Sequence, residues 1–173
     1  MMIDDWRRFF PADSLAALEG IGPFAGDALE RLGEQSLHLA PECLLTIRLL
    51  CLPTWSPACS VRITQRGLSW HFVVCELNGA HAGFDLGRLG RRYDGFLAGI
   101  EATRISAMWE YLQFWSTAPA RAGDDDLLDG TSYVLEAIDG RQHHVVIRTE
   151  LKWGETFEEF TDLLLQVVGL ARR

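Results

Sequence analysis

The sequence is poor in basic residues and has no hydrophobic run long enough to cross a membrane. Lys and Arg together number 16 against 24 Asp and Glu, which gives a formal net charge of −8. Such a surface repels nucleic-acid phosphates and anionic lipids at long range. The longest apolar stretch, residues 44–52, is interrupted by Thr46 and Arg48 and is too short for a membrane span. We therefore expect no nucleic acid and no membrane as partner.

Paired metal-binding cysteines are also lacking. Cys43, Cys51, Cys59 and Cys75 are separated by 8, 8 and 16 residues and form no CxxC pair. Structural metal sites usually draw two ligands from one short turn. The first ten residues contain no apolar segment typical of a secretory signal, which predicts a cytoplasmic protein with reduced thiols. We expect buried thiols, no metal and no cofactor.

Apolar residues are plentiful enough for one core. They make up 48% of the 173 residues, and charged residues make up 23%, as in an ordinary globular protein. No repeat, low-complexity segment or linker divides the chain, so we expect a single domain over residues 1–173. The order of segments predicts an α+β fold. Its sheet is mainly antiparallel and built of hairpins, with N-terminal helices and a C-terminal helix packed on the sheet.

The first forty residues predict two short helices. The first begins at Asp13 or Ser14 and the second at Asp27, because these side chains can cap a helix. Between them, four residues interrupt the helical pattern: Gly20, Gly22, Pro23 and Gly26.

The central part of the chain predicts strands and one helix. Residues 43–52 are almost continuously apolar, which is typical of a strand covered on both faces. Residues 96–105 indicate a strand after a glycine-rich loop, and Ser106 can cap a helix that reaches Trp115. Residues 117–127 predict a polar surface loop.

Two hairpins are predicted from turn residues. Residues 60–65 and 68–77 flank a two-residue turn at 66–67, which places Ile63 opposite Trp70. One face of this hairpin is apolar: Val61, Ile63, Trp70 and Phe72.

The second hairpin joins residues 132–138 to 141–149 through Asp139-Gly140. Both of its faces are mixed, so either face can meet the core. A capping box at 156–159 then predicts the C-terminal helix. Its apolar positions recur at helical spacing: Phe157, Phe160, Leu163, Leu164, Val167 and Val168.

Residues 15–29 contain two short helical patterns joined by the glycines of residues 20–22, and this arrangement resembles the helix-hairpin-helix family. The resemblance implies that backbone N–H groups approach a DNA phosphate at a helix start. The flanking residues include Glu19 and Asp27, where a phosphate-binding site would carry Lys or Arg. We favour two packed helices joined by a glycine turn.

His143 and His144 are candidates for general-base chemistry. Neighbours in a strand point to opposite faces, so the two imidazoles cannot act as one unit. The Asp139-Gly140 turn places Glu136 opposite His143, and a carboxylate can orient a histidine for proton transfer. No motif ties a serine or cysteine to this pair. We therefore expect a cross-strand pair on a solvated face and no catalytic residues.

Acidic and aromatic residues in the predicted loops are the candidates for partner binding. The acidic cluster lacks the spacing of a calcium loop, and it could instead contact a basic protein patch or simply be solvated. Tryptophans in loops often anchor protein interfaces. The candidate residues are Asp124, Asp125, Asp126, Asp129, Trp55 and Trp153.

The last sixty residues resemble small uncharacterised bacterial cytoplasmic proteins, some of the toxin-immunity type. The likeness comprises Phe114-Trp115-Ser116, the segment from Asp129 to Glu136, the Asp-Gly turn, a histidine-bearing strand and a final helix. It implies a cytoplasmic inhibitor that binds a basic toxin. Our hypothesis is a protein-binding module with a basic partner. The alternatives are a small-ligand-binding protein or enzyme with a site beside the sheet and, third, a helix-hairpin-helix binder of nucleic acid.

We predict negligible binding to duplex DNA at physiological salt, because neutralising the phosphate backbone requires Lys and Arg and this chain has an excess of acids. Fluorescence anisotropy with a labelled duplex over a salt series measures this. A micromolar affinity that weakens steeply with added salt would contradict the prediction and favour the helix-hairpin-helix interpretation.

Overall fold

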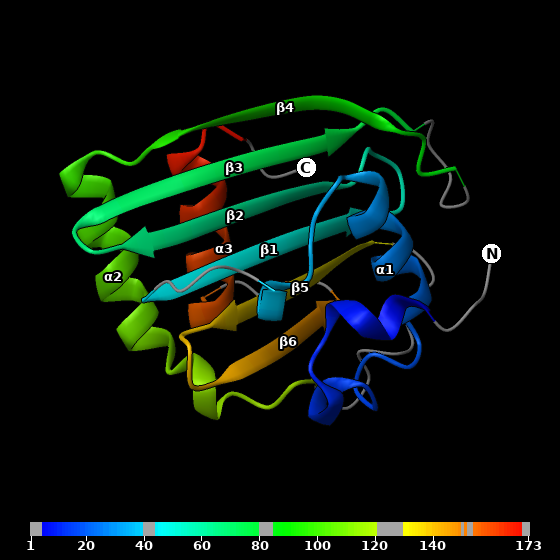
Figure 1. Ribbon diagram of the computed structural model, residues 1–173, viewed down its shortest axis with the longest axis horizontal. Helices are drawn as coiled ribbons and strands as arrows, with labels where there is room; N and C mark the ends of the chain where they lie inside the picture. The colour runs from blue at the N-terminus through cyan, green and yellow to red at the C-terminus, as the bar shows by residue number, and fades with distance from the viewer. Residues whose placement is uncertain are drawn as a thin grey trace.

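The computed structural model describes residues 5–39, 44–79, 85–120, 130–149, 151 and 154–170. Its centre is a six-stranded sheet in the order β4-β3-β2-β1-β5-β6, in which every neighbouring pair is antiparallel (Figure 1). The predicted α+β fold is therefore confirmed. The strands are β1 (Leu45–Pro53), β2 (Cys59–Arg66), β3 (Ser69–Leu77), β4 (Leu89–Phe96), β5 (Thr131–Ile138) and β6 (His143–Thr149). The helices are α1 (Gly22–Arg31), α2 (Gly99–Leu112) and α3 (Thr156–Val167), with short 3-10 turns at Asp5–Phe9, Ala12–Ser14, Leu37–Leu39 and Phe114–Ser116.

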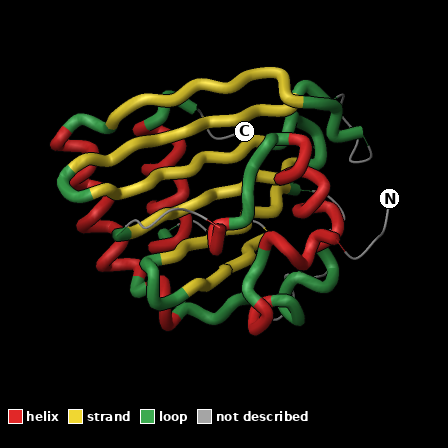
Figure 2. Tube along the Cα trace, viewed as in Figure 1, coloured by secondary structure: helices red, strands yellow, loops and turns green. Residues whose placement is uncertain are grey.

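Helical segments cover both faces of the sheet (Figure 2). In Figure 1, α2 and α3 lie behind the sheet, and α1 with the N-terminal 3-10 turns lies in front of its right-hand part. Strand β1 is buried along its length up to Leu52, which explains its almost continuous apolar sequence. The core on the α2–α3 side includes Ile47, Leu49, Val61, Phe114, Phe160 and Leu164. The core under the N-terminal segment (residues 5–39) includes Trp6, Phe10, Leu18, Leu29, Leu50 and Val134.

The register of the β2–β3 hairpin differs from the prediction by two residues. Ile63 pairs with Phe72 rather than with Trp70, because the turn consists of Gly67 and Leu68. Gly67 has φ = 59°, a value that glycine adopts without strain. A shift of two residues keeps every side chain on its face, so Ile63 and Trp70 are still buried in one core.

The predicted strand at 96–105 is wrong, because β4 ends at Phe96 and α2 begins at Gly99. The backbone N–H of Ala98 donates to the Glu101 carboxylate at 3.0 Å, and this contact caps the helix start. Ser106, the predicted cap, lies inside the helix instead.

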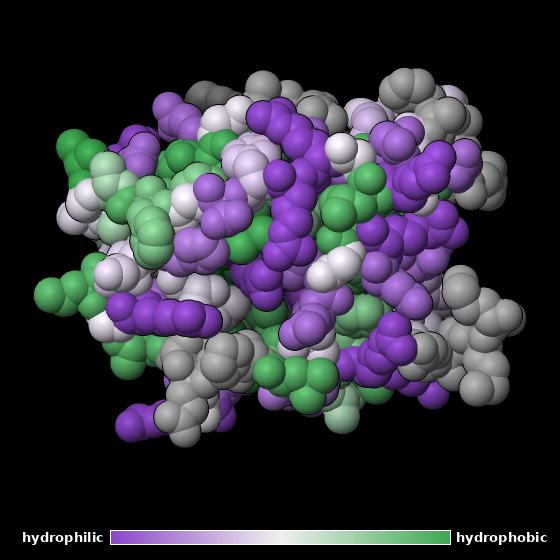
Figure 3. Space-filling view, turned by 45° about the horizontal axis from the view of Figure 1, so that its top comes forward, coloured by the Kyte–Doolittle hydropathy of each residue, from purple (hydrophilic) through white to green (hydrophobic). Residues whose placement is uncertain are grey.

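The two edges of the sheet are protected differently. Residues 117–120 cover the β6 edge, where the Ile147 N–H donates to the Pro119 carbonyl at 2.7 Å. Strand β4 instead exposes charged side chains, including Arg91, Arg92 and Asp94. Figure 3, which turns this edge toward the viewer, shows hydrophilic side chains in a band across it. Charged edge strands discourage pairing with other chains.

The N-terminal glycines belong to helix α1, which corrects the predicted helix start at Asp27. Gly22 begins the helix, and Gly22 and Gly26 pack directly on Trp6. A Cβ atom on Gly22 would lie 2.4 Å from the Trp6 ring, and one on Gly26 would lie 2.3 Å from the Trp6 Cβ. Close packing therefore accounts for these two glycines, and Asp13 and Ser14 form only a 3-10 turn.

The C-terminal helix is confirmed as α3, although its predicted capping box is not formed. The residue before the helix is Glu155, and no side chain caps it there. Glu158 instead accepts the Gly154 N–H at 2.8 Å. Phe157, Phe160 and Leu164 are buried against the sheet, as their spacing predicts. Within the described ranges, none of the helices is both long and apolar enough to cross a bilayer.

We predict that Trp70→Ala destabilises the protein by about 3–5 kcal/mol, because it removes a large buried side chain from the core shared with Ile63. Leu68→Ala is the control, since Leu68 lies fully exposed in the adjacent turn and its truncation should cost less than about 0.5 kcal/mol. Urea unfolding of both variants provides the measurement. A loss below about 1 kcal/mol for Trp70→Ala would show that this packing contributes little.

Candidate functional site: the Trp55 loop and its surroundings

Of the six predicted partner-binding residues, Trp55 is the one that the structure describes. Its side chain is 60% exposed. Trp153 and the acidic residues Asp124, Asp125, Asp126 and Asp129 lie outside the described residues. Trp55 and its surroundings are therefore the candidate site.

Trp55 lies in the connection between β1 and β2, which we call the Trp55 loop (residues 54–58). Pro53 and Pro57 flank Trp55 and fix two backbone φ angles. Ala58 at the far end is buried, and its carbonyl accepts the Leu77 N–H at 2.9 Å. The loop is thus anchored on β3 at one end, while the Trp55 side chain near its other end is exposed.

Thr54 anchors the other end of the loop to the start of β5. Its N–H donates to the Gly130 carbonyl at 2.8 Å, and its hydroxyl donates to the same carbonyl at 2.9 Å. The Gly130 N–H donates back to the Thr54 Oγ1 at 3.1 Å. Gly130 follows Asp129 directly in the sequence, so the acidic segment 124–129 joins the chain at a residue bonded to the Trp55 loop. The structure thereby bonds the Trp55 loop to a residue that lies 76 positions further along the sequence.

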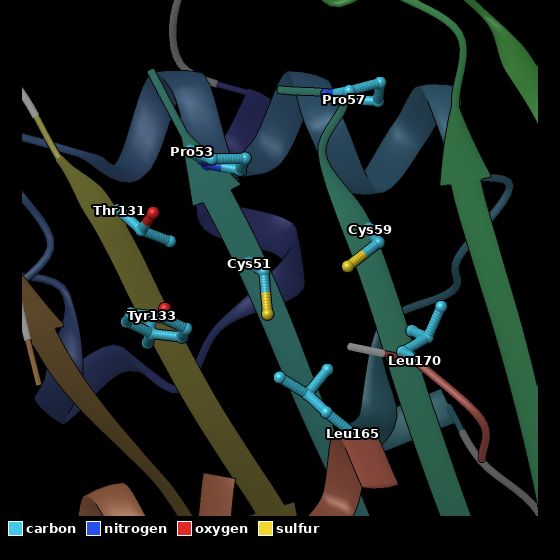
Figure 4. Close-up of a pocket in the computed structure, with 8 residues that line it drawn as sticks. All are labelled: Cys51, Pro53, Pro57, Cys59, Thr131, Tyr133, Leu165 and Leu170. Carbon is cyan, nitrogen blue, oxygen red and sulfur yellow. The ribbon is translucent and has the colours of Figure 1, made fainter. Parts of the chain in front are cut away.

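A pocket lies at the base of the loop, between the end of the sheet and the end of α3 (Figure 4). Half of the lining residues are prolines and leucines, and the other half carry two thiols and two hydroxyls. The lining residues are Cys51, Pro53, Pro57, Cys59, Thr131, Tyr133, Leu165 and Leu170. Figure 4 shows the sulfur atoms of Cys51 and Cys59 directed into this space from adjacent strands.

A separate group of ionisable residues, three of them almost fully buried, lies under the N-terminal segment, and we call it the charge cluster: Glu34, Arg48, Arg62, Glu136 and His143. Arg48 and Glu136 have side chains only 1% exposed. The Arg48 Nε donates to the Glu136 Oε2 at 3.0 Å, and its Nη2 bonds the same oxygen. The Arg48 Nη1 donates to the Gln35 carbonyl at 2.6 Å. The guanidinium therefore links β1 to β5 and to the chain after α1.

Glu34 provides the second carboxylate of the charge cluster and is also 1% exposed. It accepts the Ser60 hydroxyl at 3.2 Å, and its Oε2 lies 3.6 Å from the Arg48 Nη1 and 3.5 Å from the Arg62 Nε. Two guanidinium groups thus face two carboxylates. Such mutual neutralisation is what permits charges to be buried.

His143 and Glu136 do meet, as the sequence predicts, but on a buried face rather than a solvated one. The His143 Nε2 lies 2.7 Å from the Glu136 Oε1. The predicted register, with Glu136 directly opposite His143, is wrong: His143 pairs with Ile138 and Glu136 with Val145, so the contact is diagonal. Both oxygens of Glu136 are engaged, and within the described residues His143 bonds no serine or cysteine. His144 points to the other face, where its Nε2 lies 2.8 Å from the Thr117 carbonyl oxygen.

Sequence reasoning missed Arg48 and Glu34 as members of the charge cluster. A signal was present for Arg48, since one charged residue in an apolar strand covered on both faces requires a buried counter-charge. Glu34 follows a helix and carries no such signal. Among the residues that the structure describes, no three His, Cys, Asp or Glu side chains are grouped so as to hold a metal ion.

Comparison with known proteins identifies no family for this chain: no protein-family model matches it, and no curated protein does so either.

We predict that Arg48→Met destabilises the protein by about 3–5 kcal/mol, because it leaves Glu136 buried without its guanidinium partner. The double variant Arg48→Met, Glu136→Met should be more stable than Arg48→Met alone, since it removes the uncompensated charge. Thermal and urea unfolding measure both. An Arg48→Met protein within about 0.5 kcal/mol of the parent would contradict the structural role assigned to the charge cluster.

Proposed function

We propose that this chain is a protein-binding module that recognises a basic partner through the Trp55 loop and the acidic segment 124–129. The observation that carries the proposal is the tether between Thr54 and Gly130, which joins the loop of an exposed tryptophan to the chain directly after the acidic segment. The two elements combine the apolar anchor and the charged surroundings that protein interfaces use.

Trp55 has the properties of an interface anchor. Tryptophan is enriched among residues whose truncation weakens binding most, because it buries a large area with few rotatable bonds. The loop is fixed by the Thr54 and Ala58 hydrogen bonds and by two prolines, so little conformational entropy is lost when a partner orders it. A loop that is fixed in one conformation and exposes a tryptophan favours binding more than a mobile loop does.

The charge distribution supports a basic partner. The chain carries a net charge of −8, and residues 124–126 are three adjacent aspartates. Acidic rims accelerate encounter with basic proteins through long-range attraction. An immunity-type inhibitor of a basic toxin fits this chemistry, and we propose it as the specific form of the binding module.

The His143–Glu136 pair supports a structural role rather than the enzymatic alternative. A general base needs a carboxylate that orients it and a reactive group within reach. Glu136 is shared with Arg48 in the charge cluster, and Arg48 also donates to the Gln35 carbonyl, which ties the chain after α1 to the sheet.

We predict that Trp55→Ala raises the dissociation rate of the partner complex by about 30-fold or more, the effect of losing a strong interface anchor. Replacing Asp124, Asp125 and Asp126 with Asn should mainly slow association, and the difference should shrink as salt increases. The partner is captured on the parent protein from the source organism, purified, and its binding kinetics measured by surface plasmon resonance.

The matched control is Tyr111→Ala, because Tyr111 is 69% exposed but lies on α2. This variant should bind like the parent. Equal dissociation rates for Trp55→Ala and the parent, or equal weakening by Tyr111→Ala, would rule out the Trp55 loop as the contact surface. A captured partner without a basic surface would rule out the inhibitor form of the proposal.

A further inference from the structure

Two thiols stand opposite each other at the base of the Trp55 loop. Cys51 lies near the end of β1, Cys59 begins β2, and the two are direct register partners. Partners in an antiparallel pair place their side chains on the same face. Both are thiols and both line the pocket, where Figure 4 shows their sulfur atoms directed into the same space.

The hydrogen-bond pattern of the sheet fixes the spacing of this pair. The Ala58 carbonyl accepts the Leu77 N–H, so Ala58 directs its backbone groups toward β3 and Cys59 directs its own toward β1. Cys51 and Cys59 therefore occupy a hydrogen-bonded position, where Cα atoms are about 5.5 Å apart. Disulfides form at Cα separations of about 4.4–6.8 Å, so the backbone permits the bond.

The same position makes such a bond strained. Cβ atoms of facing residues lie about 4.5–5.5 Å apart, whereas a disulfide holds them at about 3.8 Å. Closing the bond must draw the ends of β1 and β2 together by roughly 1 Å. Strained disulfides are easily reduced, and this lability is typical of regulatory rather than structural bonds.

We infer that Cys51 and Cys59 are a modification site, at which exchange with a low-molecular-weight disulfide of the glutathione type forms a reversible bond that staples the Trp55 loop. The bond encloses residues 52–58 and so constrains the loop on which Trp55 is exposed. The consequence for partner binding rests on the proposed function, whereas the chemistry of the site does not.

The exchange balances without any further oxidant. One cysteine thiolate attacks a sulfur of the small disulfide, which forms a mixed disulfide and releases one small thiolate. The second cysteine thiolate then attacks the protein sulfur of that mixed disulfide, which forms the Cys51–Cys59 bond and releases the second small thiolate. The two protons lost by the cysteines end on the two released thiols, so the protein is oxidised by two electrons and the small disulfide is reduced by two.

Cys75 provides the internal contrast. It belongs to the opposite face of the sheet, its register partner on β2 is Ser60, and it is fully buried. Burial raises the pKa of the Cys75 thiol, which disfavours the reactive thiolate. Cys51 and Cys59 are each 6% exposed and adjoin a pocket. The pair should therefore react while Cys75 does not.

The test uses the full chain, reduced and then incubated with oxidised glutathione without denaturant. The reaction is quenched with acid, remaining thiols are alkylated, and the protein is digested with trypsin. Cys51 and Cys59 fall in one tryptic peptide, residues 49–62, which contains neither Cys43 nor Cys75. The expected result is loss of two hydrogen atoms from that peptide with no glutathione attached, and full recovery of both thiols on treatment with reduced glutathione.

Two variants keep the result interpretable. Cys43→Ser, Cys75→Ser retains only the proposed pair and should oxidise like the parent. Cys51→Ser should stop at a mixed disulfide on Cys59. A parent protein that accumulates a stable glutathione adduct, that forms its disulfide through Cys43 or Cys75, or that oxidises only in denaturant would overturn the inference.

Limited chymotrypsin digestion tests the staple itself. Cleavage after Trp55 should be several-fold slower in the oxidised than in the reduced protein, while cleavage after the exposed Tyr111 should be unchanged. Equal cleavage after Trp55 in both forms would overturn the stapling of the loop. Neither assay contains a partner protein, so failure of this inference is distinguishable from failure of the proposed function.

Discussion

The structure depends on covering β1 on both faces. This strand lies inside the sheet with β2 and β5 beside it, and its residues from Leu45 to Leu52 are all buried. A two-sided burial of this kind requires a layer on each side, so the N-terminal segment and the α2–α3 pair are both needed to complete the cores on the two faces of the sheet. Most of the chain is arranged around a strand of nine residues.

Covering β1 on both faces also buries Arg48, and the charge cluster compensates this buried charge. The same contacts hold the N-terminal segment on the sheet. Arg48 lies in the middle of β1, where water cannot reach it, and Glu136 and Glu34 compensate its charge from β5 and from the chain after α1. Because such a pair is favourable only when its geometry is complete, the N-terminal segment must lie in one position for Glu34 to reach Arg48. The charge cluster thereby favours the placement of the segment that the structure shows.

The position of the Trp55 loop follows from the same constraint. A strand covered on both faces must leave the core before it can turn, and β1 does so at Pro53, the first residue of the strand that is not fully buried. The loop emerges there beside the start of β5, and the Thr54–Gly130 bonds hold it in place. The turn into β2 brings Cys59 back opposite Cys51. The β1–β2 connection therefore carries the exposed tryptophan, and the thiol pair lies at its base.

Much of this fold could be predicted because its signals are local. The apolar run of β1, the alternation of β2 and β3 and the helical spacing of Phe157 and Phe160 each identify an element correctly. The start of α2 was missed because its cap is the Glu101 side chain rather than Ser106, and β4 was missed because an exposed edge strand lacks an apolar face.

The site was less predictable, because it depends on residues far apart in the sequence. The exposure of Trp55 could be expected from its position between two prolines. Its contact with Gly130 and the partnership of Arg48 with Glu34 could not, since both require the order of strands in the sheet. That Cys51 lies opposite Cys59 can be deduced only once the β1–β2 register is known.

The most direct test of the account is hydrogen–deuterium exchange of the protein with and without its purified partner. The account predicts slower exchange on binding in residues 52–58 and in the acidic segment up to Gly130, with little change along the exposed edge strand β4. Slower exchange confined to β4, with the Trp55 loop unchanged, would contradict it and would place the binding surface on the sheet edge instead.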